Sequence, residues 1–468
     1  MSKIVTKLPL TTLMQINSYL VDNGFSIEFN NKKFDILYQK KVWSKTNEEI
    51  KEMLLDNLSY AVSMHLPMVL NNCSGIYYNT GRPLFEPYFF QNFLRDIPSN
   101  TEVDGTNTDE IVRKFLHLDY IFRDNGIKNS HQATKNTGSS KAIVAMSFGK
   151  DSLLSFAIAE EIGLNPETVY IVESSLTYEE KHKVQLGKSF EKEFGKKLNI
   201  LKHETGRLRD YDYLNLQKSE FGWGLQSTEY ALELLPFAYY YNANNIIFGN
   251  EQSTAESYYD QEKRWKIYPC YDQTHLWTKH INQMIQIISN QSINTISIIE
   301  PLMDIMIQRI LIRRYPKYAK YQMSCFTENE TGKDYRWCQE CTVCAKMYLL
   351  SVAGGMDPKK IGFTKNMLMN NKKHFFTLFG GKSNLTYLNT GLGRDEQLFA
   401  FLIASKRNVE GDLLSIFKSS EFFQEAKDRF EELYKIFCKI YDPITIPNSL
   451  KEKVISIYKE EMELIDFL

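Results

Sequence analysis

The sequence predicts an α/β protein built around a parallel β-sheet, and two observations support this prediction. Between residues 139 and 350, short apolar runs alternate with segments of helical periodicity, a pattern typical of parallel strands covered by helices on both faces. Near the end of the same stretch, four cysteines have the spacing of a structural metal site. Because 468 residues exceed one ordinary hydrophobic core, we expect two or three domains.

Changes in composition divide the chain into three predicted units. Residues 1–138 form an α+β N-terminal domain, for which the sequence indicates no role. Residues 139–350 form the parallel-sheet domain with the four cysteines, and residues 351–468 form a helical C-terminal region. The polar stretch 124–141, rich in Ser, Asn and Gly, predicts a linker between the first two units.

Overall charge and hydropathy exclude several broad classes of protein. The net charge is −1 at neutral pH, so no global field draws the chain to nucleic acid or to anionic membranes. No apolar run approaches the ~18 residues needed to span a bilayer, and the polar first residues do not form a signal peptide. We therefore expect a cytoplasmic protein with no membrane partner. Seven cysteines, four of them clustered, favour a metal site in a reducing compartment over a disulfide framework.

The most informative stretch lies at the start of the predicted sheet domain. Residues 142–146 are five apolar residues in a row, as in a strand buried on both faces. A compact polar loop follows at 147–152, and then Leu154, Ile158 and Ile162 fall on one helical face. The strand, loop and helix together predict a phosphate-binding site, because unpaired N–H groups at a helix N-terminus attract anions.

The residue types in this loop suit a nucleotide phosphate. Gly149 lets the backbone approach a ligand closely, Ser147 and Ser152 supply hydroxyl donors, and Lys150 supplies a positive charge. Asp151 would repel a phosphate on its own, so we expect it to bind Mg²⁺ or to cap the helix. The alternative is an ordinary strand-to-helix turn that Asp151 or Ser152 caps, with no ligand.

The loop is not a Walker A loop, which has the pattern GxxxxGK[ST]. It resembles the SGGxDS signature of the PP-loop superfamily, ATP pyrophosphatases that cleave ATP to AMP and pyrophosphate. Ser147, Gly149, Asp151 and Ser152 match that signature, whereas Phe148 replaces its first glycine.

Further candidate residues follow the other predicted strands, at 169–172, 198–201 and 246–248. The carboxyl ends of parallel strands form the edge of the sheet where ligands bind. Glu173 follows the first of these strands, and Gly249 and Glu251 follow the last. Gly249 would allow a nucleotide or substrate to lie against the backbone.

The cysteine cluster is the second specific signal, with the spacing C-x12-C-x2-C-x2-C. Gaps of two residues let neighbouring thiolates converge on one ion, and an earlier cysteine completes a tetrahedron. Four cysteine ligands leave no open position, so a structural Zn²⁺ is expected; an iron–sulfur cluster is the alternative. The four predicted ligands are Cys325, Cys338, Cys341 and Cys344.

A PP-loop followed by these cysteines in one domain resembles the 7-cyano-7-deazaguanine synthase family, over residues 140–350. Segments 248–250, 300–302 and 321–326 also look similar to the family's sequences. His182 resembles the histidine of a family segment, although the Gln-Arg before it is missing. The family's Thr-Lys after Pro-Leu is also absent, because the chain has Met-Asp at 303–304.

The resemblance implies an ATP-dependent carbon–nitrogen ligase that adenylates a carboxylate of a 7-deazaguanine-type substrate, which ammonia then converts to an amide or nitrile. ATP, Mg²⁺ and Zn²⁺ are the implied cofactors. Asp151, Lys150 and His182 are the implied catalytic residues, with His182 as the acid or base. The nucleotide would contact the loop and the rim behind it, through Ser147, Phe148, Gly149, Lys150, Asp151, Ser152, Glu173 and Gly249.

Two other readings of the sequence stay open. The chain could be another PP-loop enzyme, such as a tRNA thiolase or an amidating ligase, or a nucleotide-binding module that has lost catalysis. The regions outside 139–350 are absent from a minimal synthase. They suggest a larger acceptor, such as a protein or a nucleic acid, or else a homo-oligomer or a complex with partner proteins. Synthase-like proteins of this kind also occur in bacterial antiviral gene sets.

Overall fold

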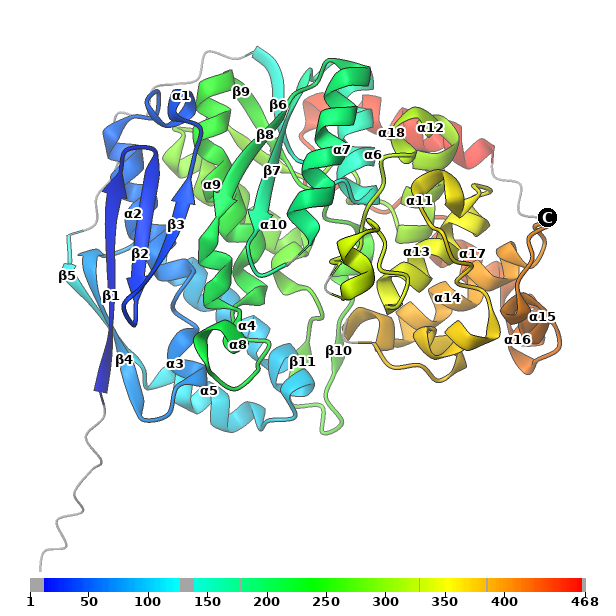
Figure 1. The fold of residues 1–468 in the computed structure, drawn as a ribbon, viewed down its shortest axis with the longest axis horizontal. Coiled ribbons are helices and arrows are strands. Elements are labelled where there is room, and N and C mark those ends of the chain that lie inside the picture. Colours follow the sequence, from blue (N-terminus) through cyan, green and yellow to red (C-terminus); the bar gives the residue numbers. More distant parts are fainter. Residues whose placement is uncertain (1–11, 127–138, 177, 328, 384–385, 465–468) are drawn as a thin grey trace, which may run out of the picture.

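A ten-stranded β-sheet runs through the molecule, and in Figure 1 helices cover both faces of the half around β6 and β7, whereas the front face of β1–β3 carries no helix. The structure is a computed structural model that describes residues 12–126, 139–176, 178–327, 329–383 and 386–464. The strand order is β12-β9-β6-β7-β8-β3-β2-β1-β4-β5. Six of the nine strand pairs are parallel and three are antiparallel. The chain is therefore an α/β protein with a large, mixed and mostly parallel sheet, as predicted at this level.

Five parallel strands form the half of the sheet that carries the predicted phosphate loop, residues 147–152. The four predicted strands are present as β6 (Ser139–Ala145), β7 (Pro166–Glu173), β8 (Leu198–His203) and β9 (Ala243–Ile247). The prediction missed the edge strand β12 (Asn294–Ile296), which has only three residues. Strand β6 pairs with β7 on one side and with β9 on the other, and the chain reaches β9 only after β7 and β8. The order of the strands therefore reverses at β6, and the switch point of the sheet lies at its end.

The other half of the sheet comes from the N-terminal region. Its strands are β1 (Thr12–Val21), β2 (Gly24–Phe29), β3 (Lys32–Leu37), β4 (Cys73–Gly81) and β5 (Asp119–Asp124). Strand β3 pairs antiparallel with β8, which joins the two halves into one sheet. Most of the predicted linker, residues 127–138, lies outside the described residues.

Helices pack against the sheet around two hydrophobic cores. The first core contains the N-terminal helices and two helices of the middle region, namely α1 (Lys40–Trp43), α2 (Glu48–Ala61), α3 (Leu66–Val69), α4 (Glu86–Asp104), α5 (Thr108–Leu116), α9 (Gln226–Tyr241) and α10 (His275–Ile288). The short α8 (Tyr211–Leu214) packs at its edge, and β10 (Tyr258–Tyr259) pairs with β11 (Lys266–Ile267) in a separate small sheet.

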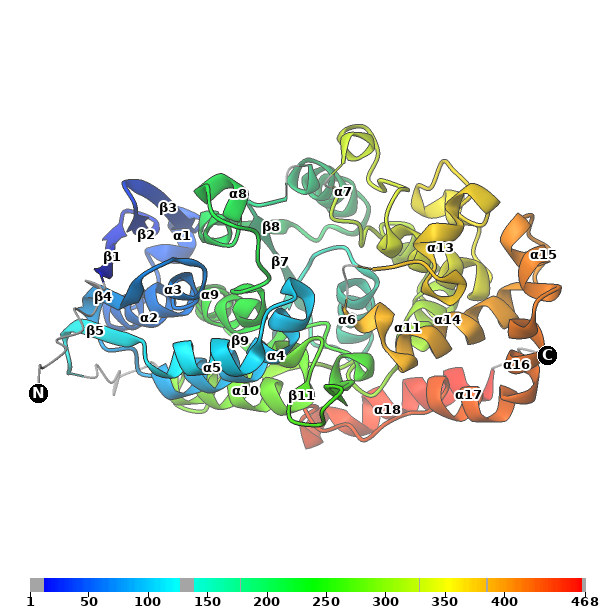
Figure 2. The ribbon, with the colours of Figure 1, turned by 90° about the horizontal axis from the view of Figure 1, so that it is seen from below.

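The second core contains the two helices after the predicted phosphate loop and the described α-helices from Asp304 onward. Its helices are α6 (Lys150–Glu161), α7 (Glu179–Phe194), α11 (Asp304–Arg314), α12 (Pro316–Ala319), α13 (Thr342–Ala353), α14 (Gly391–Ala404), α15 (Asp412–Lys418), α16 (Glu421–Asp428), α17 (Phe430–Phe437) and α18 (Asn448–Glu463). These helices gather at the opposite end of the molecule from β1 (Figure 2). Among the described residues, no helix is both long and apolar enough to cross a membrane.

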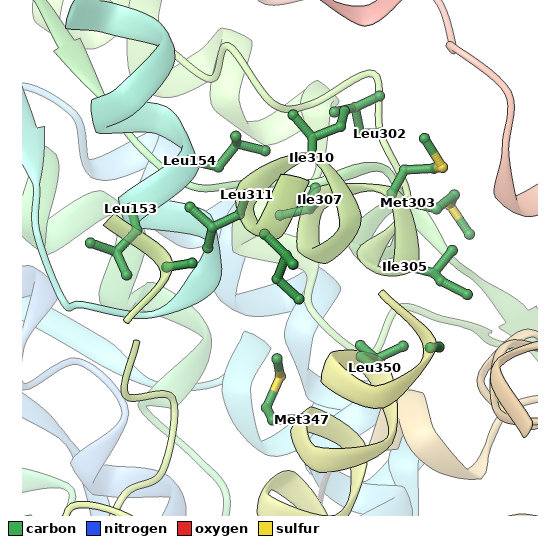
Figure 3. Close-up of a cluster of buried hydrophobic side chains, with 14 of the residues drawn as sticks. Leu153, Leu154, Leu302, Met303, Ile305, Ile307, Ile310, Leu311, Met347 and Leu350 are labelled. Carbon is green, nitrogen blue, oxygen red and sulfur yellow. The ribbon is translucent and has the colours of Figure 1, made fainter. Parts of the chain in front are cut away.

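Close packing among α6, α11 and α13 fixes the elements that carry the candidate site. Leu153 and Leu154 on α6 lie beside Ile307, Ile310 and Leu311 on α11 (Figure 3). Met347 and Leu350 on α13 complete this cluster, and all seven side chains are buried. Truncating one such leucine to alanine typically costs about 2–5 kcal/mol, so these three helices are held firmly relative to one another.

Candidate active site and metal centre

The predicted phosphate loop lies between β6 and α6, at the switch point of the sheet. The hydroxyl of Ser147 accepts a hydrogen bond from Gly149 N at 3.3 Å and donates to Ser152 Oγ at 3.3 Å. Gly149 occupies the N-cap position, and no side chain of the described residues caps α6. The alternative of a turn capped by Asp151 or Ser152 is therefore not what the structure shows, and the helix N-terminus is left open to an anion.

Phe148 keeps the loop in the shape that a glycine would give it. Its backbone is left-handed, with φ +57°, a conformation that costs a residue with a Cβ about 1–2 kcal/mol. Its ring is fully buried and packs edge-on against Phe190 with centroids 5.8 Å apart. Its carbonyl accepts a hydrogen bond from Met323 N at 2.7 Å. The departure from the PP-loop signature thus places an aromatic ring in the hydrophobic core beside the loop.

Lys150 and Asp151 open onto a cluster of buried carboxylates. The Lys150 ammonium lies 2.5 Å from Asp151 Oδ1 and 3.6 Å from Glu251 Oε2, and it contacts Asp304 Oδ1 directly. The three acidic residues each offer a carboxylate oxygen, and these oxygens all lie within 4.8 Å of one another. The Asp151 side chain is 29% exposed, against 3% for Asp304, so a ligand would enter from the Asp151 side.

Two further charged residues extend the cluster on its C-terminal side. Lys346 on α13 contacts Asp304 Oδ2 and lies 3.3 Å from Glu396 Oε2 on α14. With every group ionised, the four carboxylates and two ammonium groups leave a charge of −2. A buried surplus of this size is costly, so without a counterion burial drives carboxyl groups of the cluster toward the protonated form, whereas one divalent cation would balance all four in the charged form.

Burial and neighbouring charges shift the pKa values of Glu251 and Asp304 in opposite directions. Burial raises the pKa of Glu251 well above its usual range, and the nearby Asp304 carboxylate raises it further. Burial also favours the neutral form of Asp304, but the ammonium groups of Lys150 and Lys346 overcome this and hold its pKa below the usual range. Asp304 is therefore the carboxylate of the cluster that favours the charged form, whereas Glu251 favours the neutral form and would gain a full charge if a cation bound beside it.

Some polar atoms around the loop lack a hydrogen-bond partner among the described residues. They are Ser324 Oγ and Glu251 Oε2, both buried, and the second has the Lys150 ammonium 3.6 Å away as an ion-pair neighbour. Ser324 Oγ lies near the loop, since a Cβ built on Gly149 would be 3.6 Å from it. Buried polar atoms are seldom left unpaired in a native protein, so these atoms fit a site that binds a phosphate and a cation.

The four predicted metal ligands converge as a cluster that could bind zinc. Their sulfur atoms lie within 4.8 Å of one another, and the sulfurs of Cys338 and Cys344 are 3.7 Å apart. Zn–S bonds of about 2.3 Å in a tetrahedron separate the sulfurs by about 3.8 Å. Three of these cysteines are buried, and Cys341 is partly buried. The spacing suits one ion better than a cluster, in which separate irons would hold the sulfurs further apart.

Backbone N–H groups point at these sulfurs, as expected for thiolate ligands. Cys325 Sγ accepts from Thr327 N and Cys338 N, and Cys344 Sγ accepts from Gln339 N, each at 3.3 Å. Such bonds stabilise the negative charge of a thiolate before a metal binds. The segment also touches the phosphate loop, through the Met323–Phe148 hydrogen bond. The cysteine cluster and the predicted phosphate loop are thus directly connected.

Two predicted site residues, His182 and Glu173, have no contact with the Lys150 cluster, and the third, Gly249, contacts the protein where a ligand was expected. His182 on α7 contacts the Gly332 carbonyl at 2.7 Å, so its hydrogen bond goes to the cysteine segment. Glu173 ends β7 within a second buried cluster, where it pairs with Arg209 at 3.2 Å. Gly249 lies against α6, because a Cβ there would be 2.7 Å from Asp151 Cβ. The close approach at Gly249 is thus made by the protein itself.

Sequence reasoning missed the site residues that come from the C-terminal side. In the sequence, Asp304 stands out only as a departure from the resembled family, and Ser324 only as part of the segment 321–326. Lys346 and Glu396 carried no signal, because nothing in the sequence around them differs from an ordinary helix surface. Comparison of the chain with models of protein families and with curated proteins gives no match.

Proposed function

We propose that this protein is an ATP-dependent ligase that adenylates the carboxylate of a 7-deazaguanine-type substrate and releases pyrophosphate, with AMP released in the step that follows. The observation that carries the proposal is the open N-terminus of α6, with Lys150 and the three carboxylates of Asp151, Glu251 and Asp304 directly beside it. The helix N-terminus and Lys150 could bind a polyphosphate, and the carboxylates could bind the cation that accompanies it.

The residues of the loop divide the work of binding. The N–H groups of the first turn of α6, with the hydroxyls of Ser147, Ser152 and Ser324, would hold the pyrophosphate part of ATP. When ATP binds, the Lys150 ammonium would give up some of its contacts with the carboxylates and pair with the phosphate oxygens instead. Mg²⁺ bound by the carboxylates of the cluster would neutralise charge on the departing pyrophosphate.

The reaction follows from the poor reactivity of a carboxylate. A carboxylate oxygen attacks the α-phosphorus of ATP, and the bond from that phosphorus to the bridging oxygen of pyrophosphate breaks. The product is an acyl-adenylate, whose carbon is open to attack because AMP is a good leaving group. Ammonia adds to this carbon, AMP departs and nitrogen loses a proton, which yields an amide. The protein contributes orientation and charge stabilisation. A second ATP would adenylate the amide oxygen with release of pyrophosphate and a proton, and loss of AMP and a second proton, without further ammonia, would give a nitrile.

The cysteine segment is proposed to hold a structural Zn²⁺ that braces the phosphate loop. Residues 323 and 324 connect the two, since Met323 N bonds to Phe148 O and Ser324 Oγ lies near Gly149. With four thiolate ligands no position is open to a substrate, so the ion supplies folding energy and rigidity.

The alternative of a thiolase requires a reactive cysteine near the loop. The candidate is Cys270, whose thiol lies close enough to sense the charges of Asp272 and Glu251. Burial and these carboxylates raise the pKa of Cys270 to about 12, which keeps it protonated and unreactive at neutral pH. The ligase therefore fits better. The acceptor could be the free heterocycle or the same group passed to a protein or nucleic acid, as in an antiviral system.

The test is the nucleotide product formed from Mg-ATP and ammonium, with and without 7-carboxy-7-deazaguanine. We expect AMP and pyrophosphate that depend on the acid, and at least a hundredfold loss in Asp304→Asn, which breaks the charged cluster. Asp395→Asn is the matched control, because Asp395 on α14 pairs with Arg429 away from the cluster. ADP as the product, or full activity in Asp304→Asn, would contradict the proposal. AMP formed without the acid would keep the adenylating chemistry and redirect the search for the acceptor.

A further inference from the structure

A cavity separate from the predicted phosphate loop lies at one edge of the main sheet. Its walls come from the first half of α10, from the edge strand β12, and from residues 444–448 and 451, where the chain enters α18. Of the described residues that line it, none belongs to the phosphate loop or to the Lys150 cluster. Its volume of about 320 Å³ is at the lower end of the range for small-molecule sites, about 300–1,000 Å³.

Among the described residues, the charged side chains that line this cavity are all basic. They are Lys279 on α10 and Lys451, the fourth residue of α18. In the described part of the chain, neither ammonium group forms an ion pair. Helix α18 begins at Asn448 with no acidic residue in its first turn and with no side chain of the described residues as its cap. A lysine near a helix N-terminus is unfavourable on its own, so the cavity carries a positive surplus that an anion would neutralise.

A buried hydroxyl that faces this cavity has no hydrogen-bond partner. Thr295 is 1% exposed and lines the cavity, and its Oγ1 makes no hydrogen bond with any other described residue. On β12 it pairs with Ile246 of β9, and the side chains of paired residues lie on the same face of a sheet. Ile246 packs in the core that contains α10, so Thr295 points toward α10, which forms another wall of the cavity. Buried hydroxyls are seldom left unpaired, so Thr295 fits a contact with a ligand.

The amide groups of two half-buried asparagines in the wall are available as donors. Asn282 Oδ1 accepts from Thr295 N at 2.8 Å, and Asn294 Oδ1 accepts from Gln286 Nε2 at 2.9 Å. The Nδ2 group of each asparagine has no partner among the described residues. Together with the two ammonium groups and the Thr295 hydroxyl, the wall therefore offers N–H and O–H donors that complement an anion with several oxygens.

The part of the wall before α18 is fixed by hydrogen bonds to the segment after β12. Thr445 N and Thr445 Oγ1 donate to one oxygen of Glu300, at 2.8 Å and 2.7 Å. Tyr441 N donates to the carbonyl of Pro301 at 2.9 Å. Binding in the cavity would therefore not have to order this loop, a cost that otherwise lowers affinity.

We propose that this cavity binds the phosphate group of a small phosphate monoester. Such a group carries a charge of about −1.5 to −2 at neutral pH, which the two ammonium groups and the N-terminus of α18 would balance. A carboxylate carries a single charge and would leave one lysine unpaired. The phosphate oxygens would accept from Lys279, Lys451 and the Thr295 hydroxyl, and the rest of the molecule would lie against the apolar part of the wall, which includes Ile296 and Ile446. None of these residues takes part in the proposed function, so the two proposals stand or fall separately.

The test is titration calorimetry of the full-length protein with glycerol 3-phosphate, and with glycerol as the uncharged control. Mg²⁺ and a non-hydrolysable ATP analogue are present throughout, to keep the titrated anion from the predicted phosphate loop. We expect glycerol 3-phosphate to bind about tenfold or more tightly than glycerol, because charge-assisted hydrogen bonds are stronger than neutral ones. Lys279→Gln combined with Lys451→Gln should weaken its binding by about tenfold or more. Thr295→Val should weaken it by about threefold or more without loss of stability, because valine has a similar shape and lacks only the unpaired hydroxyl.

Lys453→Gln is the matched control, because Lys453 is exposed on α18 and does not line the cavity. Its affinity for glycerol 3-phosphate should equal that of the wild type. No binding of glycerol 3-phosphate at about 10 mM, or equal binding of glycerol, overturns the proposal, and neither result depends on whether a variant folds. Wild-type affinity in the double lysine variant overturns it as well. Tighter binding of a 5′-phosphorylated oligoribonucleotide that needs both lysines would make the ligand a nucleic acid and overturn the small-molecule assignment.

Discussion

Phe148 combines two opposing contributions to stability at one position of the phosphate loop. Its ring is fully buried and packs on Phe190, so truncation is expected to cost about 3–5 kcal/mol, the range for a buried Phe changed to Ala. Its backbone at φ +57° is strained by about 1–2 kcal/mol as long as the residue has a Cβ. Glycine at this position would lose the packing but relieve the strain.

Phe148→Ala and Phe148→Gly together isolate the backbone contribution, because both variants lose the same ring. Within ordinary helices and strands, glycine is less stable than alanine by about 0.5–1 kcal/mol. At this position we expect the reverse order, with the Gly variant more stable than the Ala variant by roughly 0.5–1 kcal/mol. Both variants should be less stable than the wild type by several kcal/mol.

Urea titrations of the zinc-loaded proteins measure these differences as free energies of unfolding. Ala159→Gly on α6 is the control, because Ala159 is buried within the helix and glycine must there be the less stable residue. If Phe148→Ala is as stable as Phe148→Gly or more so, the loop does not hold a left-handed turn in solution. The resemblance to a glycine-containing phosphate loop would then lose its structural basis.

Three further predictions concern the close contact at the loop, the metal and pH. Gly249→Ala should lower AMP formation at least tenfold without unfolding the protein, since its Cβ would lie 2.7 Å from Asp151 Cβ; Gly391→Ala, which has open space around it, should keep wild-type activity. Cys341→Ser should lose bound zinc and soluble yield together, and a folded variant with full zinc content by mass spectrometry would contradict the metal site. Burial raises the pKa of Asp96 to about 7, against about 4 in an unfolded chain. Folding therefore favours the protonated form, and the wild type loses stability as the pH rises from about 4 to 7. Asp96→Asn should remove part of that loss in urea titrations at pH 5 and pH 8, and an equal loss in both proteins would refute this.

The parts of the fold that could be predicted are those in which neighbouring residues hold the information. The apolar run at 142–146 indicates a strand buried on both faces, and in the structure Ile143 enters one core while Ala142 and Val144 enter the other. The cysteine spacing likewise brings its thiolates together, because three of them lie within one short turn and the start of α13. Local geometry decides both features.

The remainder of the candidate site depends on contacts that no local pattern encodes. Asp304 and Lys346 are separated by 42 residues, yet their side chains are in contact, because hydrophobic packing sets α11 against α13. The junction between β3 and β8 consists of two residue pairs, Ile36 with His203 and Leu37 with Lys202. So short a ladder leaves no periodicity to find, and the continuity of the sheet could not be predicted.

The flanking regions take part in the site rather than merely surrounding it. From the C-terminal region, Glu396 supplies a carboxylate partner of Lys346. From the N-terminal region, Asp96 and His65 lie so close to Gly224 and Gly222 that a Cβ on either glycine would clash with them. These glycines flank Trp223, whose ring lies beside Arg209, the partner of Glu173. Residues from all three parts of the chain therefore build the carboxyl edge of the sheet. Removing residues 351–468 would take Glu396 away from Lys346, and breaking a buried ion pair typically costs about 3–5 kcal/mol. Removing residues 1–138 would take away the side chains that pack against Gly222 and Gly224, so both flanking regions are expected to be needed for the proposed activity.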